Sequence, residues 1–275
     1  MNLITNTNIY LKDVINLRDG LKNKGVHPIG RVIAYVPGTN KVLFDRWNKV
    51  LVAGSAYLAS QNFNLTPPVQ LPTYNTDLGL ENTIALSPTE LKDRNICLFA
   101  VGTDGCGQET SQVYDVNYSK RIEPTSLIPF QIVSSSSDLS ADNRDIYFGR
   151  KIDNTNSKIL YYFKSFDTTP VIKQEYIDGT SMDEAVYSSD NTTELRTYVE
   201  MKMSNKPTDC KTYFEETVGI SEAKVNSISL LTGLAKTYNG YTYYQGIEPF
   251  TRLNFSSIPL SLEKSGVNFI YQLYY

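Results

Sequence analysis

The stretch RVIAYVPGTNKVLFDRWNKVLVAG, residues 31–54, decides the fold class. In its first half, Val32, Ala34 and Val36 alternate with larger side chains, a period typical of a half-buried strand. The tetrapeptide PGTN, residues 37–40, has the composition of a tight turn, and alternation resumes in KVLFDRW. The stretch therefore predicts a β-hairpin.

Short apolar runs separated by Gly, Asn, Asp and Pro repeat along most of the remaining chain. Aromatic and β-branched residues favour strands, and the chain holds 20 Tyr and 11 Phe. Spacings of this kind predict a mainly β fold, a β-sandwich or jelly-roll-like domain. The expected strands are NICLFAVG (95–102), QVYDVNY (112–118), LIPFQIV (127–133), DIYFGRKI (145–152), KILYYFKSFD (158–167), VIKQEYID (171–178), LRTYVEMKM (195–203), TYFEETVGI (212–220), NSISLLTG (226–233), YTYYQGI (241–247), FTRLNFSSIPL (250–260) and NFIYQLYY (268–275). The run from Ser227 also fits a helix by period, but its Ser and Thr residues favour a strand.

One or two short helices are expected near the N-terminus. Ile9, Val14 and Leu17 have the mixed spacing of an amphipathic helix, which either docks a partner or covers the chain's own sheet. A second helix is expected over residues 55–61. The three prolines within residues 64–82 predict an ordered, extended loop.

The predicted organisation is an N-terminal arm, residues 1–30, followed by a β-rich domain, residues 31–275. The Ser-rich run VSSSSDLSADNRD divides that domain into two lobes near residues 134–145, or is a long exposed loop inside one domain.

Composition excludes several classes of function. The formal net charge is -3, which provides no basic field for nucleic acid. No window has the roughly 20 apolar residues of a membrane span, and the N-terminus lacks the pattern of a signal peptide. We expect no direct binding of nucleic acid or membrane.

The stretch AVGTDGCGQE, residues 100–109, is the first candidate for chemistry. Gly102, Gly105 and Gly107 stand in the wrong order for a dinucleotide fingerprint, and no Gly-Lys-Ser/Thr follows. Cys106 lacks a nearby base, since the only histidine is His27. We expect a turn between strands whose glycines adopt positive φ.

The remaining candidates are acidic or aromatic. The carboxylates within residues 142–145 and 178–190 are typical of solvated loops. We expect neither a calcium-binding loop nor the catalytic carboxylate pair of a glycosidase there. Trp47 with Tyr35 and Phe44 forms either a sugar-stacking platform or an aromatic core cluster. Three cysteines are too few and too scattered for zinc, and one histidine disfavours acid–base catalysis. We expect no catalytic, cofactor-binding or metal residues, and no cofactor. The acidic residues are Asp142, Asp145, Asp178, Asp183, Glu184 and Asp190, with Asn143 beside the first pair.

Several segments in order resemble virion structural proteins of large tailed bacteriophages. They are RVIAYVPGTNKVLFDRWNKVLVAGSAYLA (31–59), PTYNTDLGLEN (72–82), LFAVGTDGCG (98–107), LIPFQIV (127–133), YFGRK (147–151), YYFKSFD (161–167), NSISLLTG (226–233) and the C-terminal PFTRLNFSSIPLSLEKSGVNFIYQLYY (249–275). The last two are similar to a β pattern of phage tail, neck and baseplate components.

The resemblance implies a non-enzymatic component of the virion, assembled in the host cytoplasm. It implies a ring or other symmetric homo-oligomer that contacts other virion proteins in the neck, collar, tail or baseplate. The alternatives are a receptor- or glycan-binding surface protein, or a head-decoration protein. The residues expected to make assembly contacts are Ile9, Val14, Leu17, Pro67, Pro68, Tyr74, Gly102, Gly105 and Gly107.

Overall fold

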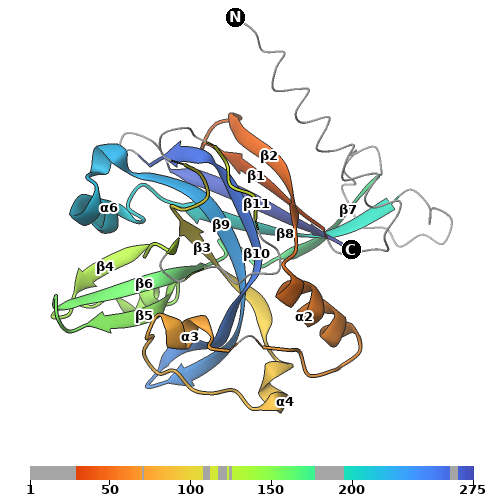
Figure 1. Cartoon of the computed structure of the whole chain (residues 1–275), viewed down its shortest axis with the longest axis horizontal. Helices are drawn as coiled ribbons and strands as arrows, with labels where there is room; N and C mark the ends of the chain where they lie inside the picture. The colour runs from red at the N-terminus through yellow and green to blue at the C-terminus, as the bar shows by residue number, and fades with distance from the viewer. Residues whose placement is uncertain are drawn as a thin grey trace, which may run out of the picture. The chain divides into compact units, whose positions relative to one another are not determined.

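The hairpin predicted from residues 31–54 is present in the computed structural model, as β1 (Ile29–Tyr35) and β2 (Val42–Lys49). The structure describes residues 29–69, 71–107, 112–116, 123, 126–176, 195–260 and 266–275. Within them the chain is mainly β, with two antiparallel sheets and a few short helices (Figure 1), consistent with the predicted β-sandwich. The predicted fold class is confirmed.

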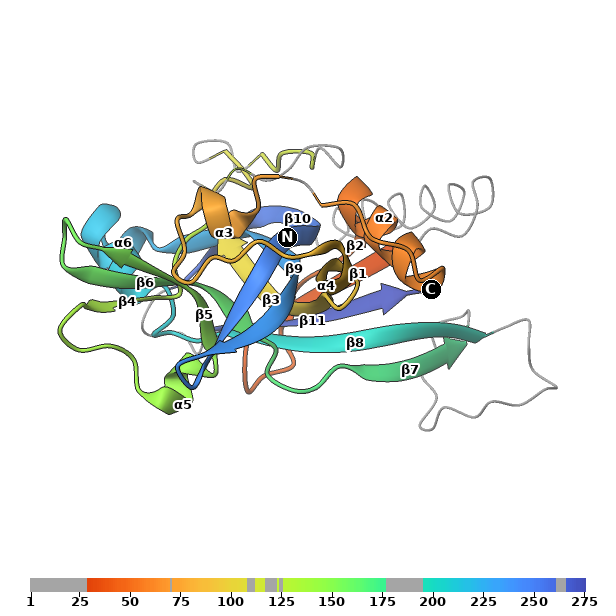
Figure 2. The same ribbon diagram turned by 90° about the horizontal axis from the view of Figure 1, so that it is seen from below.

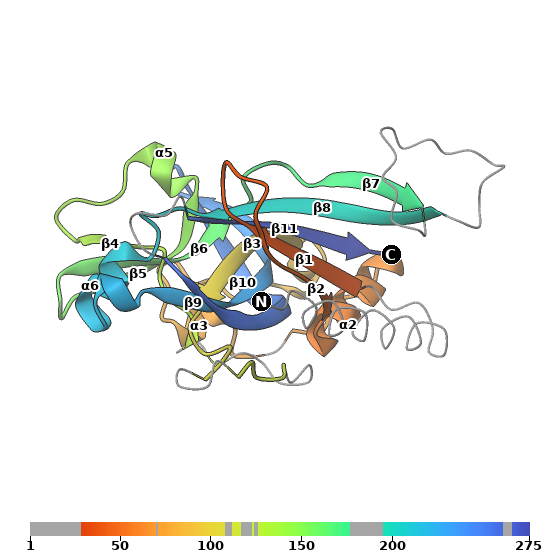
Figure 3. The ribbon, with the colours of Figure 1, turned by 90° about the horizontal axis from the view of Figure 1, so that it is seen from above.

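The first compact unit, whose described part lies in residues 29–49, 167–203 and 268–275, is built on a five-stranded sheet. Its order is β2-β1-β11-β8-β7, and the middle strands run side by side in Figure 3. β1 pairs with the C-terminal strand over its whole length, from Ile29 opposite Tyr274 to Tyr35 opposite Asn268. The strands added to the hairpin are β7 (Val171–Tyr176), β8 (Leu195–Asn205) and β11 (Val267–Tyr274).

The second unit, residues 50–166 and 204–267, holds a six-stranded sheet. The order β10-β9-β3-β6-β4 is extended by β5, which pairs with β6. Its strands are β3 (Asn95–Gly102), β4 (Gln131–Ser134), β5 (Tyr147–Asp153), β6 (Lys158–Ser165), β9 (Lys224–Tyr238) and β10 (Tyr241–Pro259). The alternative of a helix from Ser227 is thereby excluded, since β9 pairs with both β3 and β10.

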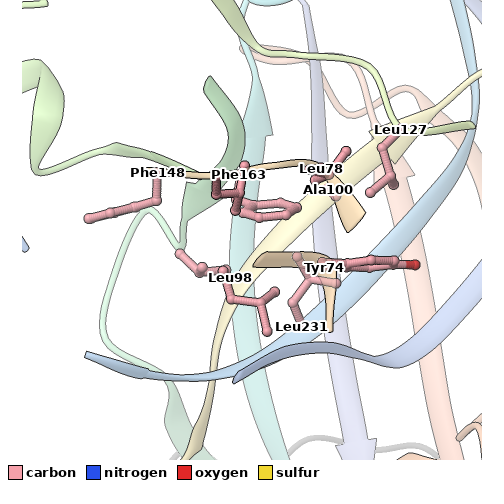
Figure 4. Close-up of a cluster of buried hydrophobic side chains, with 10 residues drawn as sticks. Tyr74, Leu78, Leu98, Ala100, Leu127, Phe148, Phe163 and Leu231 are labelled. Carbon is pink, nitrogen blue, oxygen red and sulfur yellow. The ribbon is translucent and has the colours of Figure 1, made fainter. Parts of the chain in front are cut away.

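The core of the second unit forms where a short helix covers the sheet. Tyr74 is fully buried and stacks on Phe163, with ring centroids 6.4 Å apart. Figure 4 shows both among aliphatic side chains from β3 and β9, including Leu98 and Leu231. Residues 73–80 therefore close the core rather than form the extended loop that the prolines predicted. This helix, α3 (Tyr74–Asp77), was not expected.

Three predictions of local structure are wrong. Residues 211–217 form helix α6 (Lys211–Thr217) and not a strand, because Phe214 is its one buried side chain and Lys211 pairs with Glu215 one turn on. Of residues 112–118, the described part makes only the isolated bridge from Val113 to Cys106. The two strands expected within residues 241–260 are one strand, β10, whose register shifts accommodate Pro249.

The other helices are α2 (Val52–Asn62), which confirms the helix predicted at residues 55–61, α4 (Pro88–Leu91) and α5 (Ala141–Arg144). A 3-10 turn, η2, spans Ile220–Glu222. The proposed lobe boundary, residues 134–145, lies inside the second unit between β4 and β5. Residues 1–28 lie outside the described part, while Ile29 and Gly30 belong to β1. None of the described helices combines the length and apolarity needed to cross a membrane.

Candidate assembly surface

A buried ion pair lies inside the second unit, between Lys164 on β6 and Asp209. Lys164 Nζ donates to Asp209 Oδ2 (2.8 Å) and to the Ser204 carbonyl (2.7 Å), and both side chains are at most 1% exposed. Tyr147 donates to Asp209 Oδ1 at 2.6 Å, and burial, followed by the charge of Asp209, raises the pKa of that phenol. Gln131 and the Lys206 N–H also donate to the carboxylate. Hydrogen bonds within the chain satisfy both buried charges, and removal of one partner would leave the other charge buried and unpaired.

A second buried pair supports α2. Arg94, next to β3, donates to Glu248 on β10 at 2.9 Å and to the Gly246 carbonyl at 3.1 Å. Its guanidinium lies 5.7 Å from the ring of Tyr57 on α2, whose hydroxyl donates to the Arg94 carbonyl. These contacts join α2 to two strands of the sheet.

The glycine-rich loop is held close to the sheet by the chain's own atoms. A Cβ on Gly102 would lie 2.5 Å from the Ser126 carbonyl oxygen, and one on Gly105 would lie 2.0 Å from that of Asn226. Neither glycine has positive φ, so the predicted reason for them is wrong: close backbone approach, and not φ, requires glycine here. The Gly107 N–H donates to the Gln112 carbonyl at 2.9 Å, but no named strand follows in the described residues 112–116, so they do not show a turn between two strands.

The cysteines lie in the interior and have no metal-ligand geometry. The Asn226 amide donates to Cys106 Sγ (3.4 Å), which also contacts Ser257 Oγ at 3.2 Å. Burial raises the pKa of the Cys97 and Cys210 thiols, which keeps them protonated at neutral pH. No group of three or more metal-ligating side chains occurs among the described residues. His27 lies outside them, as do Asp178, Asp183, Glu184 and Asp190.

The aromatic residues proposed as a sugar platform do not share one face. Trp47 contacts Tyr274 (centroids 5.1 Å apart), whereas Phe44 contacts Phe269 (6.5 Å). Trp47 and Phe44 are three residues apart on one strand, so their side chains point to opposite faces. Trp47 is partly buried against a cluster of the first unit that includes Tyr274, so it forms neither the platform nor the core cluster with Phe44 that the sequence suggested.

The most exposed apolar side chains in the second unit belong to one stretch of chain. Phe63 is 76% exposed, Leu65 59% and Leu71 79%, and Val52 at the start of α2 is 61% exposed. Residues 50–76 contain no Asp, Glu, Lys or Arg, although such residues make up 20% of the chain. We call the exposed part of residues 52–72 the charge-free surface; it runs from α2 toward α3 in Figure 2.

The sheet anchors the start of this surface, and contacts with α2 and Lys92 hold the segment that follows α2. The Leu51 N–H donates to the Phe250 carbonyl at 3.1 Å, and Gly54 packs so closely that a Cβ would lie 2.4 Å from the same oxygen. Beyond α2, the Leu65 N–H donates to the Ser60 carbonyl at 2.8 Å and Lys92 Nζ donates to the Asn64 carbonyl at 3.1 Å. The apolar side chains are thus exposed on an anchored backbone.

The residues predicted to make assembly contacts differ in exposure, and several of them are buried. Pro68 is exposed on the charge-free surface, and Pro67 beside it is buried. Tyr74, Gly102 and Gly105 are buried in the packing of the second unit. Gly107 is partly exposed, and Ile9, Val14 and Leu17 lie outside the described residues. Asp142 and Asn143 are on α5 and Asp145 caps its end.

Sequence reasoning missed Phe63 and Leu65, whereas Leu71 lies in the loop from Pro67 to Tyr74 that was predicted to make assembly contacts. The signal that finds them is the absence of charge across residues 50–76, since depletion of charged residues marks the centre of protein interfaces. No family model, curated protein or solved structure matches this chain. The functional argument therefore rests on the chain's own residues.

Proposed function

We propose that this chain is a non-enzymatic structural component of a tailed-bacteriophage particle, of the neck, collar, tail or baseplate. It acts by self-assembly and by contacts with other virion proteins. The observation that carries the assembly part is the charge-free surface, on which Phe63, Leu65 and Leu71 expose most of their area.

Exposed apolar residues are common singly, but their concentration on an uncharged stretch is typical of an interface. Each such side chain gains roughly 1.5–3 kcal/mol when it is fully removed from water. A partner that covers the stretch meets no charged residue of the stretch itself, because none lies between residues 50 and 76, although the Lys92 ammonium adjoins it at the Asn64 carbonyl.

The interior supports the non-enzymatic part of the proposal. The ion pairs Lys164–Asp209 and Arg94–Glu248 are buried, and their charged groups contact one another. General acid–base and nucleophilic catalysis need such groups within reach of a substrate. The particle part rests on the resemblance of the ordered motifs to phage virion proteins.

Mass photometry of the purified full chain tests self-assembly. We expect multimers for the wild type, and monomers for Leu71→Asp, which places a charge where the partner must exclude water. Val218→Asp is the matched control, since Val218 is 55% exposed and lies after α6, away from residues 52–72. A wild type that stays monomeric as its concentration rises contradicts the proposal.

Mass spectrometry of purified phage particles from the genome that encodes the chain tests the virion part. We expect the chain at a fixed multiple of the other structural proteins. Its absence from intact particles, with presence in the infected-cell lysate, contradicts a virion role.

A further inference from the structure

In the described part of the chain, Lys164–Asp209 is the one lysine–carboxylate pair whose side chains are both buried. They are 1% and 0% exposed, and the rings of Phe130 and Tyr147 lie 5.9 and 5.5 Å from Lys164 Nζ. Burial of this kind penalises charged groups, so a neutral amine and a neutral carboxylic acid are closer in free energy to the ion pair than they are in water. A neutral amine is a nucleophile, whereas an ammonium has no free electron pair.

The contacts of Lys164 hold its nitrogen beside the carboxyl carbon of Asp209. Lys164 Nζ lies 2.8 Å from Asp209 Oδ2 and 2.7 Å from the Ser204 carbonyl oxygen, so it is fixed on two sides. A carboxyl carbon–oxygen bond of about 1.2 Å places Nζ within about 4 Å of Asp209 Cγ. Reacting atoms held close to this separation need little further approach.

Hydrogen-bond donors around the carboxyl group of Asp209 favour attack on its carbon. The Tyr147 hydroxyl (2.6 Å) and the Gln131 amide (3.1 Å) both donate to Oδ1, and the Lys206 N–H donates to Oδ2 at 2.8 Å. Donors aimed at an oxygen on which negative charge develops stabilise the tetrahedral intermediate of acyl transfer. The site therefore combines a nucleophile, an electrophile and stabilising donors, all from this chain.

We propose that Lys164 and Asp209 form an intramolecular amide bond, a covalent cross-link between β6 and the turn that precedes α6. A proton first passes from the Lys164 ammonium to Asp209 Oδ2. The amine then attacks Cγ, and an electron pair of the Cγ–Oδ1 bond moves onto Oδ1. A second proton passes from the nitrogen to Oδ2, the Cγ–Oδ2 bond breaks, and water leaves as the Cγ–Oδ1 double bond forms again. One N–C bond replaces one C–O bond, and nothing is oxidised or reduced.

The cross-link closes a loop of the chain between positions 164 and 209. In molecules that have reacted, the amide replaces the ion pair, and the unfolded chain loses conformational freedom as it does with a disulfide. Once the product water has left, the buried site withholds the water that hydrolysis of the amide needs. The proposal concerns the stability of one copy of the chain and does not depend on the self-assembly proposed above.

Peptide mapping of the purified full chain by mass spectrometry tests the bond. We expect the denatured chain to be lighter than its sequence by one water molecule, and a tryptic fragment to join the peptide of Lys164 to that of Asp209. Because water can also be lost at an Asp-Gly sequence, the joined fragment decides. Lys164→Arg is the matched variant: it keeps a positive charge but supplies no neutral amine, so it should have the full mass and no joined fragment.

An exposed pair in the same protein is the internal control. Lys158 Nζ and Glu216 Oε1 are only 2.6 Å apart, but their side chains are 34% and 39% exposed, so water solvates both charges and we expect no joined fragment there. Separate peptides for Lys164 and Asp209 in a folded wild-type chain of full mass overturn the proposal, as does a bond from Lys164 to any other residue. Either result leaves the mass-photometry test of self-assembly unchanged.

Discussion

The Lys164–Asp209 cluster and the charge-free surface lie in the same unit and are opposite in character. In the cluster, an ammonium and a carboxylate are withdrawn from water, and hydrogen bonds from Tyr147 and from backbone groups satisfy them. On the charge-free surface, the apolar side chains of Phe63 and Leu71 are exposed to water, and their neighbours in the sequence are uncharged. The difference teaches that this unit pairs its buried charges internally and leaves its most exposed apolar side chains in water.

Removal of one partner from the cluster should give the largest effect. Asp209→Ala leaves the Lys164 ammonium buried without its carboxylate, which we expect to lower the free energy of unfolding by about 3–5 kcal/mol. Urea denaturation measures this. Replacement of both charges, in Lys164→Met with Asp209→Leu, should cost less than the single change. A single variant within 1 kcal/mol of the wild type contradicts the structural role.

A change beneath α2 should have an intermediate effect. Gly54→Ala introduces a Cβ at 2.4 Å from the Phe250 carbonyl oxygen, so the helix must shift. We expect a loss of roughly 1–3 kcal/mol despite the higher helix propensity of alanine. Ser55→Ala on the same helix is the control, and thermal melting should show it to be neutral or slightly stabilising. Equal melting temperatures for both variants would mean that α2 is not anchored at Gly54.

The cluster around Asp138 is intermediate in burial: it is more exposed than the Lys164–Asp209 pair and less exposed than the charge-free surface. Burial acts to raise the pKa of Asp138, but hydrogen bonds from Tyr161 and the Leu139 N–H and the charge of Arg150 outweigh it and hold the pKa below its ordinary value. A carboxyl group whose pKa is lower in the folded state than in the unfolded state stabilises the folded protein at pH values above its unfolded-state pKa. This stabilisation is lost as the pH falls through the folded-state pKa.

Asp138→Asn therefore should cost less than about 1 kcal/mol at pH 7, since partly exposed ion pairs are screened. It should also flatten the decline in stability below pH 4. Urea midpoints at pH 7, 4 and 3 measure both effects. A variant whose decline parallels that of the wild type shows that Asp138 does not contribute to acid sensitivity.

Much of the fold follows from the sequence because most strands alternate visibly. The hairpin at residues 31–47 has alternation, a turn and resumed alternation, and local signals were sufficient to find it. The capping box of Ser87 and Glu90, with Pro88 between them, was an equally local signal for α4 that the prediction left unused. The sequence predicts a strand at α6 because Tyr213 and Phe214 favour strands, whereas tertiary packing buries only Phe214.

The assembly surface was predicted only in part. Pro68 was identified because proline marks an ordered loop, but the burial of Tyr74 depends on Phe163, which is far away in the sequence. Close approach at Gly102 and Gly105 depends on Ser126 and Asn226, which local pattern does not reveal. Exposure of Phe63 and Leu71 depends on tertiary packing, and no residue-by-residue propensity contains that information.

Hydroxyl-radical footprinting of the wild-type chain at low and high concentration tests the central claim most directly, because it reads the exposure of individual side chains. We predict that oxidation of Phe63, Leu65 and Leu71 falls as the concentration rises, while that of Val218 stays constant. Unchanged oxidation of the first three residues in a sample that has assembled would contradict the account.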